Sequence, residues 1–153
     1  GVGVATQGNG TKRWVAIFAA KDTPTNGTVQ QMLDLLNDFR GTEGAADFAL
    51  NDNLSIAAQA QATHNASVQL NEAATGGVGI EDQVADTGYT YGTLMWTLSS
   101  GGAAESLERW TDTQEEHDLM LDARFADVGI GVATGGTKQW WVVIYAEPVV
   151  PAP

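Results

Sequence analysis

The amino-acid sequence carries the same glycine-rich pattern near both of its ends. Gly1-Val-Gly-Val-Ala-Thr6 recurs as Gly129-Ile-Gly-Val-Ala-Thr134, and the Gly-Thr-Lys and Trp-Val pairs that follow at 10–15 recur at 136–142. Apolar, β-branched residues on both sides of a glycine-rich turn predict a β-hairpin. A repeat over so long a distance indicates tandem domains, in which residues 1–20 are the tail of a preceding unit. Convergence on a common turn pattern is the alternative.

Composition and charge limit the classes of protein to be considered. The chain has 153 residues, of which 43% are hydrophobic, enough for one globular domain without crosslinks. The absence of cysteine excludes disulfides, a thiolate nucleophile and sulfur-ligated zinc. No apolar stretch approaches the roughly 20 residues of a membrane-spanning helix. A net charge of −12 repels phosphate groups, so we expect no binding to nucleic acid and no membrane insertion.

Turn-forming residues divide the chain into four parts. Residues 1–20 have the pattern of the duplicated hairpin, and residues 21–27 contain the Pro, Asn and Gly of a linker. Residues 28–147 form the domain, and residues 148–153 form a proline-rich tail that cannot continue a sheet. The first part is therefore either the remnant of a preceding repeat or a strand pair for assembly.

Within the domain, the apolar spacing predicts an α+β fold, with helices packed on a small antiparallel sheet. Thr28 and Gln31 form a capping box that begins the first helix. Helices are predicted at 28–40, 54–68, 80–86 and 102–110, a strand at 89–98 and a closing hairpin at 128–145. We expect the second helix to bury Leu54, Ala57, Ala58, Ala62 and Val68. The remaining core is expected to contain Leu33, Leu36, Trp110 and Phe125.

Six segments of the domain follow one another in an order typical of a known family. They lie at 32–40, 51–59, 83–89, 110–121, 125–133 and 140–144. Together they resemble the SCP or CAP superfamily (cysteine-rich secretory protein, antigen 5 and pathogenesis-related 1) in its cysteine-free bacterial form. The resemblance covers about residues 29–147. It implies an α-β-α sandwich, with the N-terminal hairpin as an addition, and a secreted or extracellular protein.

The resemblance also implies a cleft lined by two His and two Glu, which in some members bind a divalent metal, and here the sequence departs. No His is present near Glu72, where the first is expected, and Trp96 stands at the first Glu. At the position of the family's second Glu, this chain has Thr111-Asp-Thr113. At the position of its last His, this chain has Glu116, or His117 if one residue is inserted. We therefore predict no metal and no cofactor, with Trp96 filling the cleft.

Two classes of function are compatible with this sequence. The first is a non-catalytic extracellular module for binding or structural assembly, in a surface, fibre or adhesion role. The second is a ligand-binding or hydrolytic protein that uses a rearranged cleft around Glu72, Trp96, Glu116 and His117. A bound metal, or a pocket lined by these four residues, would favour the second.

Assembly is expected to involve the N-terminal hairpin. Its backbone groups need partners, and its apolar side chains must leave water. The hairpin can extend the sheet of its own domain, or it can complete the sheet of a neighbouring copy, which would give a chain or fibre. The candidate residues for this assembly are Trp14, Ile17, Phe18 and Trp141.

Overall fold

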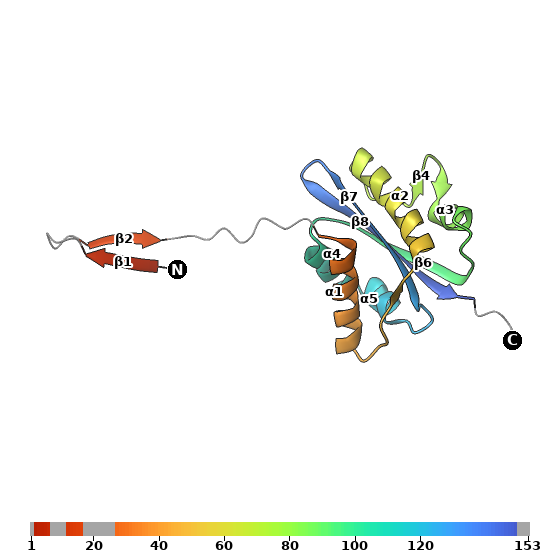
Figure 1. Cartoon of the computed structure of the whole chain (residues 1–153), viewed down its shortest axis with the longest axis horizontal. Coiled ribbons are helices and arrows are strands. Elements are labelled where there is room, and N and C mark those ends of the chain that lie inside the picture. Colours follow the sequence, from red (N-terminus) through yellow and green to blue (C-terminus); the bar gives the residue numbers. More distant parts are fainter. Residues whose placement is uncertain (1, 7–11, 17–26, 150–153) are drawn as a thin grey trace.

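The computed structural model describes residues 2–6, 12–16 and 27–149 of the chain (Figure 1). The predicted linker, apart from Gly27, lies outside the described residues, as do Ile17, Phe18 and the last four residues of the tail. The helices are α1 Val29–Thr42, α2 Asp52–Val68, α3 Ile80–Asp86, α4 Ala103–Thr111 and α5 Gln114–Leu121. The strands are β1 Val2–Thr6, β2 Lys12–Ala16, β3 Ala49–Leu50, β4 Ala74–Thr75, β5 Val78–Gly79, β6 Tyr91–Ser100, β7 Asp127–Gly135 and β8 Lys138–Pro148.

The domain is a sandwich of helices on both faces of a four-stranded sheet, which confirms the predicted α-β-α fold (Figure 1). The strand order is β3-β7-β8-β6, with β3 parallel to β7 and the other pairs antiparallel. Helices α1, α4 and α5 pack on one face, and α2 and α3 pack on the other. No helix of the described residues is long and apolar enough to cross a membrane.

Strand β8 lies at the centre of this sheet and supplies both halves of the core. Its side chains alternate between the two faces, as the geometry of a strand requires. Trp141, Val143 and Tyr145 point to the face of α1, α4 and α5. Val142, Ile144 and Ala146 point to the face of α2 and α3, and all six side chains are fully buried. Strands buried on both faces read as continuous apolar runs, as this one does.

Helix α2 lies directly on strand β7 because the strand has glycine where the helix crosses it. A Cβ atom at Gly129 would meet the backbone of Leu54, and one at Gly131 would meet the backbone of Ala58. Gly135 lies against the backbone of Ala66 in the same way. Glycine is used where two backbones approach closely. The alternating glycines of the repeated motif therefore allow a helix to pack directly against the strand.

Side chains of the helices cap both edges of the sheet. On β7, the Ser55 hydroxyl accepts a hydrogen bond from the Ile130 amide at 3.3 Å. The Gln59 amide group bonds both the N–H and the C=O of Val132, at 3.1 and 2.9 Å. On β6, the indole N–H of Trp110 donates to the Leu98 carbonyl at 3.3 Å, and Arg109 donates to the Ser100 carbonyl at 3.1 Å. These bonds occupy backbone groups that an added strand would otherwise use.

Several local predictions are confirmed. Thr28 and Gln31 form the capping box at the start of α1, with reciprocal side chain–backbone bonds of 2.9 and 3.2 Å. Helix α3 has the predicted bounds, and Gly88, which follows it, has a φ of 79°. Apart from Val68, the predicted core residues are buried, although Leu33 is only partly buried at the edge of its cluster.

Two predictions about the ends of elements were wrong. Val68 is 41% exposed, and α2 buries Gln61 and Asn65 instead. The Gln61 amide donates to Asn65 at 3.0 Å and to the Glu72 carbonyl at 2.7 Å. Gln61 thus provides a hydrogen-bond partner for the backbone of the loop that crosses the helix. The tail does not leave the sheet before Pro148, because this proline pairs with Tyr91 as the last residue of β8, where a missing N–H costs little.

Strands β1 and β2 pair antiparallel with each other, as predicted for the N-terminal hairpin. In the described part of the chain they form a two-stranded sheet, separate from the four-stranded sheet. Trp141, one of the residues proposed for assembly, is fully buried in the domain core, and its indole N–H donates to the Gly101 carbonyl at 3.0 Å. Its side chain is therefore not available to a neighbouring molecule.

Replacing Gly131 with Ala is expected to lower the free energy of unfolding by about 1–3 kcal/mol, because the added methyl group forces α2 away from β7. Gly41→Ala is the matched control. No atom lies within 4 Å of a Cβ at Gly41 in α1, so the same substitution there should leave stability unchanged or raise it by about 0.5–1 kcal/mol. Urea denaturation followed by circular dichroism measures both, and equal losses would contradict the role of Gly131.

Candidate functional site

The four residues predicted to line a cleft lie on opposite sides of the sheet. Glu72 follows α2 and lies beside His64 of that helix, with 2.7 Å between Glu72 Oε2 and His64 Nε2. Trp96 lies opposite Ile144 of β8 and packs against the cluster formed by α2 and α3. Glu116 and His117 belong to α5, on the other face. The structure therefore does not bring the four together.

Trp96, which was predicted to fill the cleft, packs on the face of α2 and α3 and therefore does not lie beside Glu116 and His117 of α5. Successive residues of a strand point to opposite faces, so an error of one position in an alignment reverses the face. The neighbouring residue, Thr97, faces the α5 side, where its hydroxyl lies 3.1 Å from the hydroxyl of Tyr145. Thr97 and Tyr145, rather than Trp96, are therefore the strand residues on the side of Glu116.

Glu116 is the carboxylate of α5 that extends toward the core. Burial raises its pKa above that of an ordinary glutamate, and a hydrogen bond with Thr113 partly offsets this shift. Burial also raises the pKa of Tyr145, and the negative charge of Glu116 adds to this effect. In the alignment without an inserted residue, Glu116 stands at the position of the last His of the family pattern.

His117 points away from this group. Its ring packs edge-on against Phe39 of α1, with 5.4 Å between the ring centroids. Its Nδ1 atom lies 3.4 Å from Asp118, and the side chain is partly exposed. His117 therefore joins α5 to α1 by an aromatic contact.

The donor set does not fit the metal that the family resemblance implies. Among the described residues, no group of three His, Asp or Glu side chains is placed to hold an ion. Glu116 lies beside hydroxyl groups, and Glu72 and His64 form an exposed pair on their own side of the sheet. We derive no chemical step through a metal.

A buried cation, missed in the sequence, holds the α5 side together. Arg40 is the last residue of the buried stripe Met32, Leu36, Arg40 on α1. Its guanidinium donates to the Met120 carbonyl at 2.6 Å and to the Ala46 carbonyl, and lies 3.9 Å from the centre of the Phe48 ring. Burial lowers its pKa. Its place four residues after Leu36, in line with the apolar stripe, was the signal that could have identified it.

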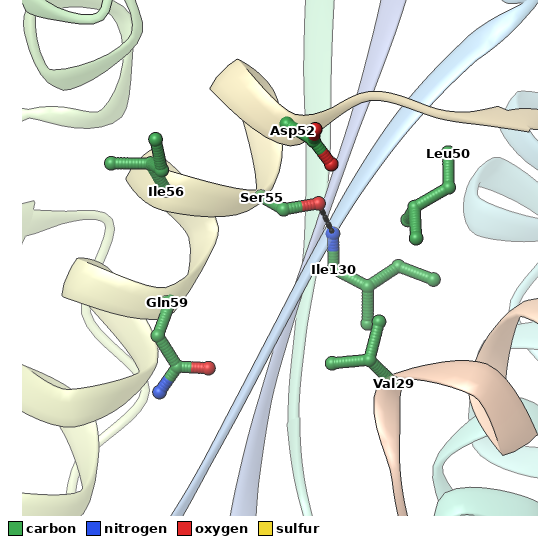
Figure 2. A pocket seen from close by; sticks show the side chains of 7 residues that line it. All are labelled: Val29, Leu50, Asp52, Ser55, Ile56, Gln59 and Ile130. Carbon is green, nitrogen blue, oxygen red and sulfur yellow. Dashed lines mark hydrogen bonds between the residues drawn. The ribbon is translucent and has the colours of Figure 1, made fainter.

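A groove of about 520 Å³ opens at the β7 edge of the sheet, between the start of α1 and the side of α2 (Figure 2). Its lining is mostly apolar, and Asp52 is its carboxylate. The hydroxyl of Ser55 is already engaged with the Ile130 amide, as Figure 2 shows. The lining residues are Val29, Leu50, Asp52, Ser55, Ile56, Gln59 and Ile130.

The arrangement of this groove supports contact with an apolar group rather than a reaction. Leu50 and Ile56 are 39% and 61% exposed, so the groove offers two accessible aliphatic side chains. No histidine lines the groove to act as a base for Ser55. None of the four residues predicted for the cleft lines it either.

Comparison with known proteins places this fold. The sequence model of the cysteine-rich secretory protein family, CAP, matches residues 33–145. An outer surface protein from Borrelia burgdorferi is similar in structure, with a TM-score of 0.72 at 11% identity, and the match covers 86% of this chain and 97% of that one. No curated protein matches the sequence.

Two further solved structures are similar to this chain but longer. An extracellular protein with an SCP domain from Bacillus anthracis has a TM-score of 0.68 at 13% identity, over 90% of this chain and 46% of that one. A cysteine-rich secretory protein from Staphylococcus aureus has a TM-score of 0.62 at 15% identity, over 78% and 38%. This chain thus spans less than half of either, and the likeness concerns the fold. Since the family model covers most of the domain, the chain belongs to the cysteine-rich secretory protein (CAP) family.

Proposed function

We propose that this CAP domain is a non-catalytic extracellular module that acts by binding, in a surface, fibre or adhesion role. The observation that carries the proposal is the separation of the four cleft positions by the sheet. General acid–base or metal chemistry needs groups that converge on one substrate atom. The similar structures from an outer surface protein and an extracellular protein support an extracellular location.

The groove beside β7 supplies a surface for such binding. It joins two exposed aliphatic side chains, Leu50 and Ile56, to the apolar side chain of Ile130 at the sheet edge. Its walls are α2 and the start of α1, and α2 is fixed on β7 by the glycine contacts. A rigid apolar groove with a few polar groups suits recognition of a hydrophobic side chain or ligand.

Ile56→Asp should reduce binding of the apolar fluorescent probe anilinonaphthalene sulfonate, because it puts a charge in the wall of the groove. Val68→Asp is the control, since Val68 is an exposed aliphatic residue of the same helix outside the groove. The fluorescence enhancement of the full chain, measured against probe concentration, should fall several-fold for the first variant only. Equal titrations for the wild type and Ile56→Asp would contradict the groove as a binding surface.

Zinc is expected not to bind stoichiometrically to the family's cleft position, because the required side chains do not converge there. The full chain would be incubated with zinc, dialysed and measured by elemental analysis, with His117→Ala as the comparison. Residual zinc should be far below one ion per chain and equal in the two proteins. Stoichiometric zinc that is lost in His117→Ala would contradict the proposal.

Glu116→Gln is expected to stabilise the domain at neutral pH, because partial burial disfavours the ionised carboxylate. Its folded-state pKa is raised, so the native protein binds the proton more tightly than the unfolded chain does. The cost of Glu116 is therefore complete at neutral pH, and it disappears as the pH falls below the unfolded value of about 4.3.

The thermal unfolding midpoints of the wild type and of Glu116→Gln should thus converge as the pH falls. Glu115→Gln is the control in the same helical turn, because that side chain is exposed and should show little difference at any pH. A midpoint for Glu116→Gln that is lower than that of the wild type at pH 7 would show that the carboxylate makes a favourable contact.

A further inference from the structure

The N-terminal hairpin has the same strand register as the hairpin that closes the domain. Val4 lies opposite Trp14, and the corresponding Val132 lies opposite Trp141. The pairs from Val2 with Ala16 to Ala5 with Arg13 agree in this way with the pairs from Ile130 with Val143 to Ala133 with Trp140. Nearer the turn the two hairpins differ by one residue, because Lys12 of the repeated Gly-Thr-Lys lies opposite Thr6, whereas Lys138 lies opposite Gly135. A chance similarity of turn residues would not require the strands to pair in one register.

The correspondence continues in the sequence beyond the described part of the hairpin. Residues 14–19 read Trp-Val-Ala-Ile-Phe-Ala, and residues 141–146 read Trp-Val-Val-Ile-Tyr-Ala. In the domain, Ile144, Tyr145 and Ala146 are fully buried, on alternate faces of the sheet. The counterparts of two of these core residues are Ile17 and Phe18. The repeated segment therefore carries the pattern of a central strand covered on both faces.

Strand β1 also has a glycine at the position where β7 packs against a helix. Gly3 is the counterpart of Gly131, at which a Cβ would meet the backbone of Ala58 in α2. Glycine weakens a strand, because it adds conformational entropy to the unfolded chain and offers no side chain to pack. Its use at the same position of both hairpins is explained if β1, like β7, lies under a closely packed helix.

The hairpin thus has two positions to be filled by another part of a protein. One is the glycine face of β1, which corresponds to the surface of β7 under α2. The other is the outer edge of β2, since its counterpart β8 has β6 along that edge. In the described residues, β2 pairs with β1 alone. An unpaired strand edge favours docking of a further strand.

Neither this domain nor a second folded copy can fill these positions without losing its own hairpin. Helix α2 is already seated on Gly129, Gly131 and Gly135, and β6 is paired with β8 from Tyr91 to Ser100.

We propose that residues 2–19 are the closing hairpin of a second CAP unit, whose helices and β6-like strand are encoded before it in the same polypeptide. The partner of the hairpin is therefore a helix with small residues facing Gly3, together with a strand along the edge of β2. The linker at 21–27 then joins two successive CAP units. This proposal is independent of whether the domain binds through its groove.

The test is a fusion in which residues 27–128 of this chain are placed directly before Gly1 of the full chain, so that Gly1 follows Val128 as Gly129 does. Amide hydrogen exchange is measured at β1 and β2 in the fusion and in the chain itself. The added helices and β6 should then enclose the hairpin. Its amides should exchange at least about tenfold more slowly in the fusion than in the chain itself.

Two variants of the fusion make the result specific. Gly3→Val puts a side chain where the helix backbone must lie, and should abolish the protection while the domain at 27–149 stays folded. Val2→Ile, which introduces the residue present at position 130, should retain the protection of the hairpin amides. Unprotected hairpin amides in the fusion, or protection that survives Gly3→Val, would overturn the proposal. Protection already present in the chain itself, together with a mass that rises with concentration, would overturn it in favour of a neighbouring copy.

Discussion

The close contact between α2 and β7 is the constraint on which the rest of this structure depends. Glycine at 129, 131 and 135 brings the helix backbone against the strand, and the alanines of α2 complete the contact. Because the helix lies so near, the side chains of Ser55 and Gln59 reach the backbone of β7 and cap its edge. The same approach fixes one wall of the groove. Packing, edge capping and the binding surface therefore have one cause.

The other face of the sheet is filled in the opposite way, with large side chains. Trp110, Trp141, Tyr145 and Phe125 occupy the space under α1, α4 and α5, and Arg40 joins these elements through carbonyl groups at helix and loop ends. Glu116 of α5 lies on this face. Burial disfavours the charge of this carboxylate, and its hydrogen bond with Thr113 offsets that cost only in part.

Local signals in the sequence predicted the fold, whereas the site depended on information that no single segment carries. The bounds of α3 were readable because Gly79 and Gly88 flank it, and α1 because Thr28 and Gln31 cap it. The face of Trp96 was not readable, because a one-residue uncertainty in a strand exchanges its two faces. An alanine-rich helix such as α2 has weak amphipathic contrast, so the burial of Gln61 in place of Val68 became clear only from the loop that Gln61 supports.

The capped edges of the sheet have a consequence for any polypeptide in which such domains follow one another. Domains joined by short linkers meet at high local concentration, and pairing between the strands of adjacent units is a common route to misfolding in repeated sequences. Ser55 and Gln59 on one side, and Arg109 and Trp110 on the other, hold backbone groups that a neighbour's strand would need. In such a polypeptide, these bonds would hinder pairing between this sheet and a strand of an adjacent domain.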